Sequence, residues 1–163
     1  MDFDAPVPDN GEADTPDYRL IELLFFGYRD FIGIADAALT AYGYGRAHHR
    51  VLHFVHRNRD LTVGELLAIL KISKQAAARV IKTLTDDGMI ITHPGEDDRR
   101  ERHLTTTTKG AQLADHLSQL QSERIRSAIA DLPADSRDAV ERFLMRLVEP
   151  AERLEVERLT DKA

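Results

Sequence analysis

The chain has 163 residues, a hydrophobic content of 42%, a net charge of −6 and no cysteine. This length corresponds to a single domain, and the lack of cysteine excludes disulfides, thiolate metal sites and cysteine-based redox sensing. We find no signal-peptide pattern and no apolar run of membrane-spanning length, so we expect a cytoplasmic protein with no membrane partner.

The negative charge is concentrated at the N-terminus. Residues 1–17 contain six acidic side chains and no Lys or Arg, so we predict a disordered acidic tail. The rest of the chain has 22 acidic and 22 basic residues and is neutral. Local charge governs contact with phosphates more than the total does, so nucleic acid remains a possible partner.

The spacing of apolar residues predicts a long helix over residues 18–41. One stripe includes Leu20, Leu24 and Phe31, and a second includes Phe25 and Tyr28. A helix that is apolar on two sides needs packing partners on two sides. Residues 42–45 interrupt it, and residues 46–58 are predicted to form a second helix.

Three histidines on this second helix have a spacing that can bind metal. His49, His53 and His56 follow the i, i+4, i+7 pattern of one helical face. The helix holds no Asp or Glu, and partly exposed histidines are more often solvated. We therefore expect no metal, and a histidine-based metal-responsive regulator remains an alternative.

Two short helices separated by a tight turn follow. Thr62 and Glu65 match a capping box at the start of the first. Lys71 and Ile72 form the connection, and Ser73 is a candidate N-cap for a second helix over residues 74–85. Gly88 fits the left-handed position that would end this helix.

The second of these helices has one apolar and one polar face. The apolar face holds Ala77, Val80, Ile81 and Leu84, and the opposite face holds Lys74, Gln75, Ala78, Arg79 and Lys82. Arg pairs bidentately with guanine, Gln pairs with adenine, and Lys contacts phosphate. We predict that Lys74, Gln75, Ala76 and Arg79 read bases and that Ser73 and Lys82 contact phosphates. An ordinary solvated helix face is the alternative.

A charged hairpin is predicted next. Residues 89–93 are rich in strand formers, Pro94-Gly95 signals a turn, and residues 104–108 form the return strand. The segment between them carries Arg99, Arg100 and Arg102. We expect these arginines to contact DNA, although an exposed loop in which acids surround the arginines is a second explanation.

Residues 61–110 resemble the DNA-binding core of the MarR family of bacterial transcription regulators. Asp98-Arg99-Arg100 matches the Asp-x-Arg element of the family's wing, and Thr107 to Gly110 keeps the Thr-x-x-Gly end of its return strand. Thr106 stands where Leu is usual, and a reading from Leu104 to Gly110 is also possible. The resemblance implies that Arg100 enters the minor groove and that Asp98 orients the wing through a local ion pair. It extends over residues 18–158.

The C-terminal part is predicted to be helical. Residues 110–131 form one helix with Ile125 facing inward, Leu132-Pro133 ends it, and a last helix begins at Asp135 or Ser136 and is interrupted at Pro150. We expect the first helix and the last two to interleave in a homodimer, as the resemblance also implies. Such a dimer would hold two recognition helices about 34 Å apart, the spacing needed to read a near-palindrome. A monomeric bundle is the alternative.

Aromatic residues gather near the first helix, and the resemblance implies a pocket for small aromatic or phenolic ligands. Tyr28, Phe31, Arg46 and His49 are the candidate lining residues. Packing of these aromatics in the dimer core is the simpler explanation for most of them.

Four segments follow from these predictions: the acidic tail (1–17), an N-terminal dimerisation helix (18–45), the winged helix-turn-helix core (46–110) and C-terminal dimerisation helices (111–163). The fold is mainly α with a small β-hairpin wing. We find no phosphate loop and no catalytic motif, and expect neither an enzyme nor a cofactor. The expected function is an operator-binding repressor that a small molecule releases. A winged-helix protein-interaction module without DNA binding is the alternative.

Overall fold

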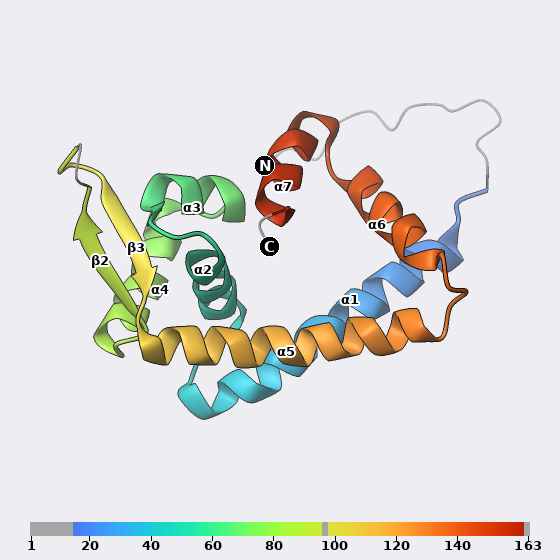
Figure 1. The fold of residues 1–163 in the computed structure, drawn as a ribbon, viewed down its shortest axis with the longest axis horizontal. Coiled ribbons are helices and arrows are strands. Elements are labelled where there is room, and N and C mark those ends of the chain that lie inside the picture. The colour runs from blue at the N-terminus through green and yellow to red at the C-terminus, as the bar shows by residue number, and fades with distance from the viewer. Residues whose placement is uncertain (1–14, 96–97, 162–163) are drawn as a thin grey trace, which may run out of the picture.

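The computed structural model describes residues 15–95 and 98–161, so most of the predicted acidic tail lies outside the described residues. The helices and strands are α1 (Tyr18–Leu39), η1 (Thr40–Tyr42), α2 (Arg46–Arg57), β1 (Leu61–Thr62), α3 (Val63–Leu70), α4 (Lys74–Asp86), β2 (Ile90–Pro94), β3 (Arg102–Thr106), α5 (Thr108–Ala130), α6 (Ser136–Leu147), η2 (Pro150–Glu152) and α7 (Arg153–Thr160). The mainly helical fold with a small β wing is confirmed (Figure 1).

The predicted helix ends are confirmed where a side chain caps them. The backbone N–H of Glu65 donates to Thr62 Oγ1 at 3.1 Å, and Glu65 Oε2 accepts from the Thr62 N–H at 2.9 Å. Ser73 Oγ accepts from the Ala76 N–H at 3.2 Å. Gly88 has a φ of +67°, the left-handed conformation expected just after α4. These local bonds explain why the helix-turn-helix could be located from sequence.

The wing differs from the predicted two-stranded hairpin. Its sheet has three antiparallel strands in the order β1-β3-β2. Strand β1, which sequence analysis missed, pairs Leu61 with Leu104. The return strand begins at Arg102 rather than at the predicted residue 104, because Arg102 pairs with Pro94 at the end of the ladder.

Buried apolar side chains from five elements form the core that supports the wing and α4. Leu52, Leu66, Leu84, Leu104 and Leu117 come from α2, α3, α4, β3 and α5, and each is at most 1% exposed. Helix α5 leaves the base of the wing and runs alongside α1 (Figure 1). The core therefore couples the wing, the helix-turn-helix and the long helices.

The N-terminal half of α1 and the C-terminal helices expose large apolar side chains. They are Tyr18, Leu20, Ile21, Leu23, Leu24, Phe25, Phe26 and Tyr28 on α1, Phe143, Leu144 and Leu147 on α6, and Leu154 on α7. Ile125, which we predicted to face inward, is 44% exposed on α5. The predicted interruption at Pro150 is confirmed, since η2 separates α6 from α7. Among the described helices, none is long and apolar enough to cross a membrane.

Candidate DNA-binding interface

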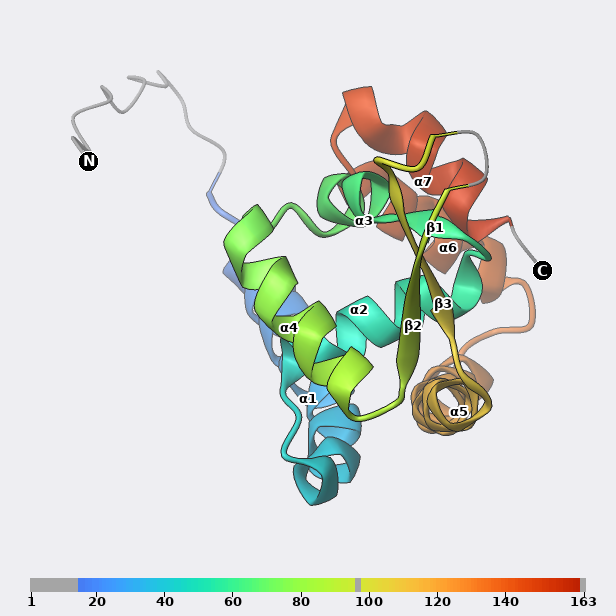
Figure 2. The same cartoon turned by 90° about the vertical axis from the view of Figure 1, so that its left-hand side faces the viewer.

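Helix α4 is held to the core by its inner face and leaves its outer face in solvent. Ala77 and Leu84 are fully buried and Val80 is 9% exposed, whereas Ile81 is only partly buried. The outer face carries the side chains predicted to meet DNA, all of them exposed: Ser73, Lys74, Gln75, Ala76, Arg79 and Lys82. Figure 2 shows α4 and the wing strands on the same side of the molecule.

A shallow groove separates α4 from the wing. It has a volume of about 420 Å³ and is lined by Lys74, Ala78 and Lys82 from α4 and by Thr92 and Arg102 from the two wing strands. Lys82 also pairs with Asp86 one turn later, at 2.5 Å. The strand therefore places Arg102 beside the lysines of α4, although sequence analysis put it in the charged tip.

The wing turn is organised by Asp98. Its Oδ1 accepts a 2.8 Å hydrogen bond from the backbone N–H of Arg100 and lies 3.4 Å from Arg100 Nε. The predicted local ion pair is thus present. The Arg100 side chain is 94% exposed, and Arg99 is exposed beside it, so both cations can reach a ligand outside the protein.

The base of the wing is fastened to the start of α5. Thr107 Oγ1 donates to the carbonyl of Gly88 at 2.7 Å and accepts from the N–H of Gly110 at 3.0 Å, which makes it the N-cap of α5. Gly110 lies so close to Met89 that a Cβ at position 110 would stand 1.9 Å from the Met89 carbonyl oxygen. Only glycine fits this contact without a shift of the backbone.

The three predicted histidines of α2 contact different partners. His56 Nε2 lies 2.9 Å from Asp115 Oδ1, while the His49 and His53 rings meet edge to face with centroids 6.4 Å apart. Burial lowers the pKa of His53, and the neighbouring His49 lowers it further. Within residues 15–95 and 98–161, no group of three or more His, Asp or Glu side chains is placed to hold a metal ion.

The four residues predicted to line an effector pocket are spread over α1 and the start of α2. Tyr28 is 59% exposed, Phe31 and His49 are partly buried, and Arg46 Nε pairs with Asp36 Oδ2 at 2.8 Å. Burial lowers the pKa of His49. An acidic ligand at Arg46 would share the guanidinium with the carboxylate of Asp36.

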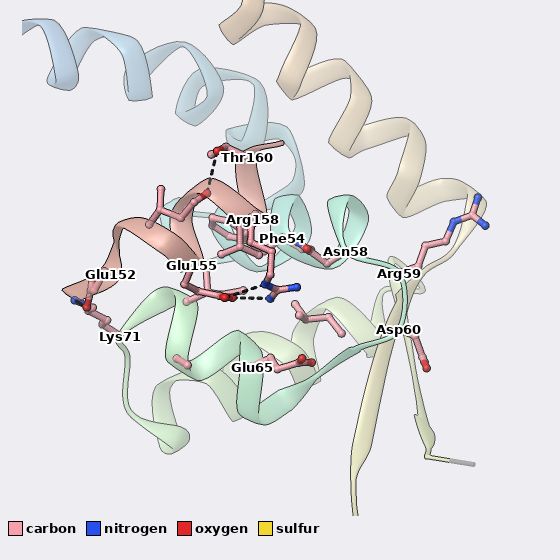
Figure 3. A pocket seen from close by; sticks show the side chains of 15 residues that line it. Phe54, Asn58, Arg59, Asp60, Glu65, Lys71, Glu152, Glu155, Arg158 and Thr160 are labelled. Atoms are coloured by element: carbon pink, nitrogen blue, oxygen red, sulfur yellow. Dashed lines mark hydrogen bonds and ion pairs between the residues drawn. The ribbon is translucent and has the colours of Figure 1, made fainter. Parts of the chain in front are cut away.

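A cavity of about 650 Å³ lies elsewhere, between α7 and the α2–α3 region (Figure 3). Phe54, Ile69 and Leu159 are among its apolar lining residues, and none of the four predicted pocket residues belongs to the lining. Lys71 of the helix-turn-helix forms an ion pair with Glu152 at its edge. Sequence analysis missed this cavity because it depends on where α7 folds back, which no local pattern indicates.

Comparison with known proteins gives a consistent result. A model of the MarR family matches residues 42–101. The HTH-type transcriptional regulator PetP of Rhodobacter capsulatus is 40% identical over 141 residues, which cover 86% of this chain and 85% of that protein.

Solved structures share the fold at low sequence identity. Streptococcus pneumoniae FabT in complex with DNA has a TM-score of 0.73 at 18% identity and covers 83% of this chain and 97% of its own. A mutant MarR from E. coli complexed with operator DNA has a TM-score of 0.64 at 21% identity, with coverages of 81% and 95%. At this level of identity the structures show a common fold.

Proposed function

The chain belongs to the MarR family of winged helix-turn-helix transcription regulators, and we propose that it binds a near-palindromic operator as a homodimer and represses transcription. Family membership also supports the prediction that it is a DNA-binding regulator rather than an enzyme. The observation that carries the proposal is the exposed cationic face of α4 beside the groove that Arg102 lines.

In this proposal each side chain has a separate role. Gln75 and Arg79, with Lys74 and Ala76, read base edges in the major groove. Ser73, Lys82, Arg99 and Arg102 contact phosphates, and Arg100 enters the minor groove while Asp98 orients it. The support is that all of these side chains are exposed and that α4 and the wing strands lie on the same side of the molecule, although the Ser73 hydroxyl also caps α4.

Dimerisation is supported by the apolar surface of α1 and α6. A run of large exposed side chains between Tyr18 and Tyr28, together with Phe143 and Leu147, is unfavourable in water and typical of an interface. A second copy of the chain would cover this surface. Its two-fold symmetry would place the recognition helices about 34 Å apart, one turn of the DNA duplex.

Release by an effector is a further part of the proposal. A small aromatic or phenolic acid would bind near Tyr28, Phe31, Arg46 and His49 and change the spacing of the two recognition helices. Thermal-shift screening with aromatic carboxylates tests this. If no such compound changes the melting temperature or releases operator DNA, the effector part is wrong.

The main experiment selects bound duplexes from a random pool and measures their affinity against salt, with sedimentation of the free protein alongside. We expect a near-palindromic consensus, a dimer, and an affinity that falls steeply with salt because phosphate contacts release counterions. A monomer, or a protein that shows no salt-dependent retention on DNA, would contradict the proposal, and the lack of retention would favour a protein-interaction module. Metal analysis of the purified protein tests the metal-responsive alternative.

A further inference from the structure

The carboxylate of Asp60 contacts a histidine on each of the two long wing strands, β2 and β3. Asp60 lies in the loop before β1, His93 lies on β2 and His103 lies on β3. Asp60 Oδ1 is 3.2 Å from His93 Nε2, and Asp60 Oδ2 is 3.1 Å from His103 Nδ1. These three residues come from positions far apart in the sequence, and together they join the two strands to the loop.

The backbone around these residues is shaped to make the contact. Asp60 has a φ of +61°, a left-handed conformation that Asp and Asn tolerate better than most residues. Its carbonyl oxygen also lies 3.0 Å from His103 Nδ1. A Cβ at Gly95 would stand 2.8 Å from His103 Nε2, so glycine allows the backbone to pass close to the His103 ring. The Asp60 side chain points away from the Arg158–Glu155 pair, at the edge of the cavity nearest the wing (Figure 3).

All four ring nitrogens of the two histidines face oxygen atoms that accept hydrogen bonds. His103 Nε2 lies 3.6 Å from Glu101 Oε2, and His93 Nδ1 lies 3.3 Å from the Pro94 carbonyl oxygen, while the other two nitrogens face Asp60. A neutral imidazole carries one N–H and would leave a lone pair against one of these oxygens, whereas an imidazolium donates from both nitrogens. The geometry around His103 therefore favours its protonated ring.

The charges around His103 also favour its protonated form. The two rings stack with centroids 5.8 Å apart, and the carboxylates of Asp60 and Glu101 stabilise a positive charge on His103. Burial lowers the pKa of His103, but its bonds to Asp60 and Glu101 outweigh this and leave the pKa above its ordinary value. Glu65 of α3 is a third carboxylate: hydrogen bonds from Thr62 lower its pKa, and the charge of His103 adds to this. Arg59 and Arg102 are next to members of the cluster in the chain, and Arg158 of α7 also lowers the pKa of Glu65.

We propose that Asp60, His93 and His103 form a wing clamp, in which the His93 ring and the protonated His103 ring tie strands β2 and β3 to the loop before β1 and hold the wing in its DNA-binding orientation. The proposal rests on the DNA-binding function proposed above, because the wing carries Arg99 and Arg100. None of the three clamp residues needs to touch DNA. They are positioning residues, and their effect reaches the DNA through the angle of the wing.

The direction of the pH dependence follows from His103. A group whose pKa is raised by its bonds contributes fully at pH values below its ordinary pKa, and this contribution is lost as pH rises through the raised pKa. The clamp is therefore closed in mildly acidic solution and weakens toward alkaline pH. Affinity for DNA at constant ionic strength should fall over the same interval.

Two measurements on the full chain test the clamp. The first is an NMR titration of the histidine ring protons without DNA, in the parent and in Asp60→Asn, since Asn tolerates the left-handed backbone at position 60. We expect the titration midpoint of His103 to lie above the ordinary value in the parent and to fall in the variant. An unchanged midpoint overturns the proposal whether or not the protein binds DNA.

The second measures affinity for one selected duplex between pH 6 and pH 8, once without and once with a chelator. We expect the parent to lose about three- to tenfold, which is below the roughly hundredfold limit that linkage to a single proton sets over two pH units. Asp60→Asn and the His93→Gln, His103→Gln double variant should have much flatter profiles. His116→Gln, which removes an exposed histidine of α5, is the matched control and should keep the parent profile.

Equal flattening by the control, or a parent profile in Asp60→Asn, overturns the clamp. A pH dependence that disappears when chelator is added also overturns it, because a bound metal rather than a proton would then join the residues. If the parent binds no duplex at any pH, the proposed function fails, and the NMR titration alone decides whether the clamp exists.

Discussion

The hydroxyl of Tyr44 donates a 2.7 Å hydrogen bond to Oδ2 of Asp87. Tyr44 stands at the elbow between α1 and α2, and Asp87 is the C-cap of α4. His48 stacks on the Tyr44 ring with centroids 4.8 Å apart. Burial of the phenol, together with its bond to Asp87, raises the pKa of Tyr44. The elbow of the long helices is thus joined directly to the end of the recognition helix.

Removing that hydroxyl should weaken the fold. We expect Tyr44→Phe to lower the free energy of unfolding by about 1.5 kcal/mol, the low end for a bond to a charged group, because Asp87 is exposed to water. Urea denaturation measures this. Tyr42→Phe removes the hydroxyl of the exposed ring that stacks on Tyr44. The free energy of unfolding of this control should stay within about 0.5 kcal/mol of the parent's. Equal losses in both variants would show that the bond to Asp87 contributes nothing specific.

Arg79 lies on the outer face of α4 and is proposed to read a base. We expect Arg79→Ala to cost about 1–3 kcal/mol of binding free energy and to relax the preference at one base position. Affinities for the selected operator and its single-base variants measure both effects. Arg137→Ala removes one cation from an exposed ion pair on α6 and is the charge-matched control. A loss that is the same for every base variant would assign Arg79 to the phosphates instead.

Arg100 is proposed to contact DNA without reading a unique sequence. Arg100→Ala should weaken binding to many duplexes and reduce the slope of log affinity against log salt by about 1. Asp98→Asn keeps an oxygen that can accept from the Arg100 N–H and removes the charge opposite Nε. We expect it to preserve the salt slope while weakening binding less than Arg100→Ala does. An unchanged slope in Arg100→Ala would exclude a phosphate-lined minor groove as its partner.

Ser73 caps α4 and is also proposed to contact a phosphate, and one pair of variants separates these two roles. Ser73→Ala removes the N-cap of α4 and should cost about 1 kcal/mol of stability. Ser73→Asp keeps a capping oxygen but adds a negative charge where phosphate is proposed to lie, so stability should hold while DNA affinity falls. Thermal unfolding and DNA titration give the two readouts. If Ser73→Asp binds DNA like the parent, the start of α4 does not approach the backbone.

Gly110 is required by a close backbone contact. In Gly110→Ala the new Cβ would stand 1.9 Å from the Met89 carbonyl oxygen. We expect a loss of at least about 2 kcal/mol, although alanine gains about 1 kcal/mol of helix propensity over glycine. In Gly64→Ala the nearest atom to the new Cβ is Thr62 Oγ1 at 3.9 Å, so this control should be neutral or stabilising. Similar stabilities for the two variants would contradict the contact.

Sequence analysis located the parts of this fold that local chemistry specifies. The Thr62–Glu65 capping box, the Ser73 cap and left-handed Gly88 are all made within a few residues, and each was predicted. Strand β1 was missed because two residues carry no periodic signal and its partner Leu104 lies far along the chain.

In the candidate interface, too, local features were predicted and contacts between distant segments were missed. The exposed face of α4 followed from helical spacing, and the Asp98–Arg100 pair followed from the resemblance. The position of Arg102 beside α4 was not predicted. The charged residues around Arg102 suggested a loop, but Arg102 pairs with Pro94 and so belongs to strand β3. The contact of Tyr44 with Asp87 joins segments whose approach only the packed structure determines.

Helix α5 is one uninterrupted rod of 23 residues, from Thr108 to Ala130. At 1.5 Å per residue it is about 34 Å long, so a tilt of about 5° at one end displaces the other by about 3 Å. Thr107 and Gly110 pin one end beneath the wing, and the rod lies along α1 beyond it. A rearrangement of α1 that tilts α5 would therefore also move the base of the wing.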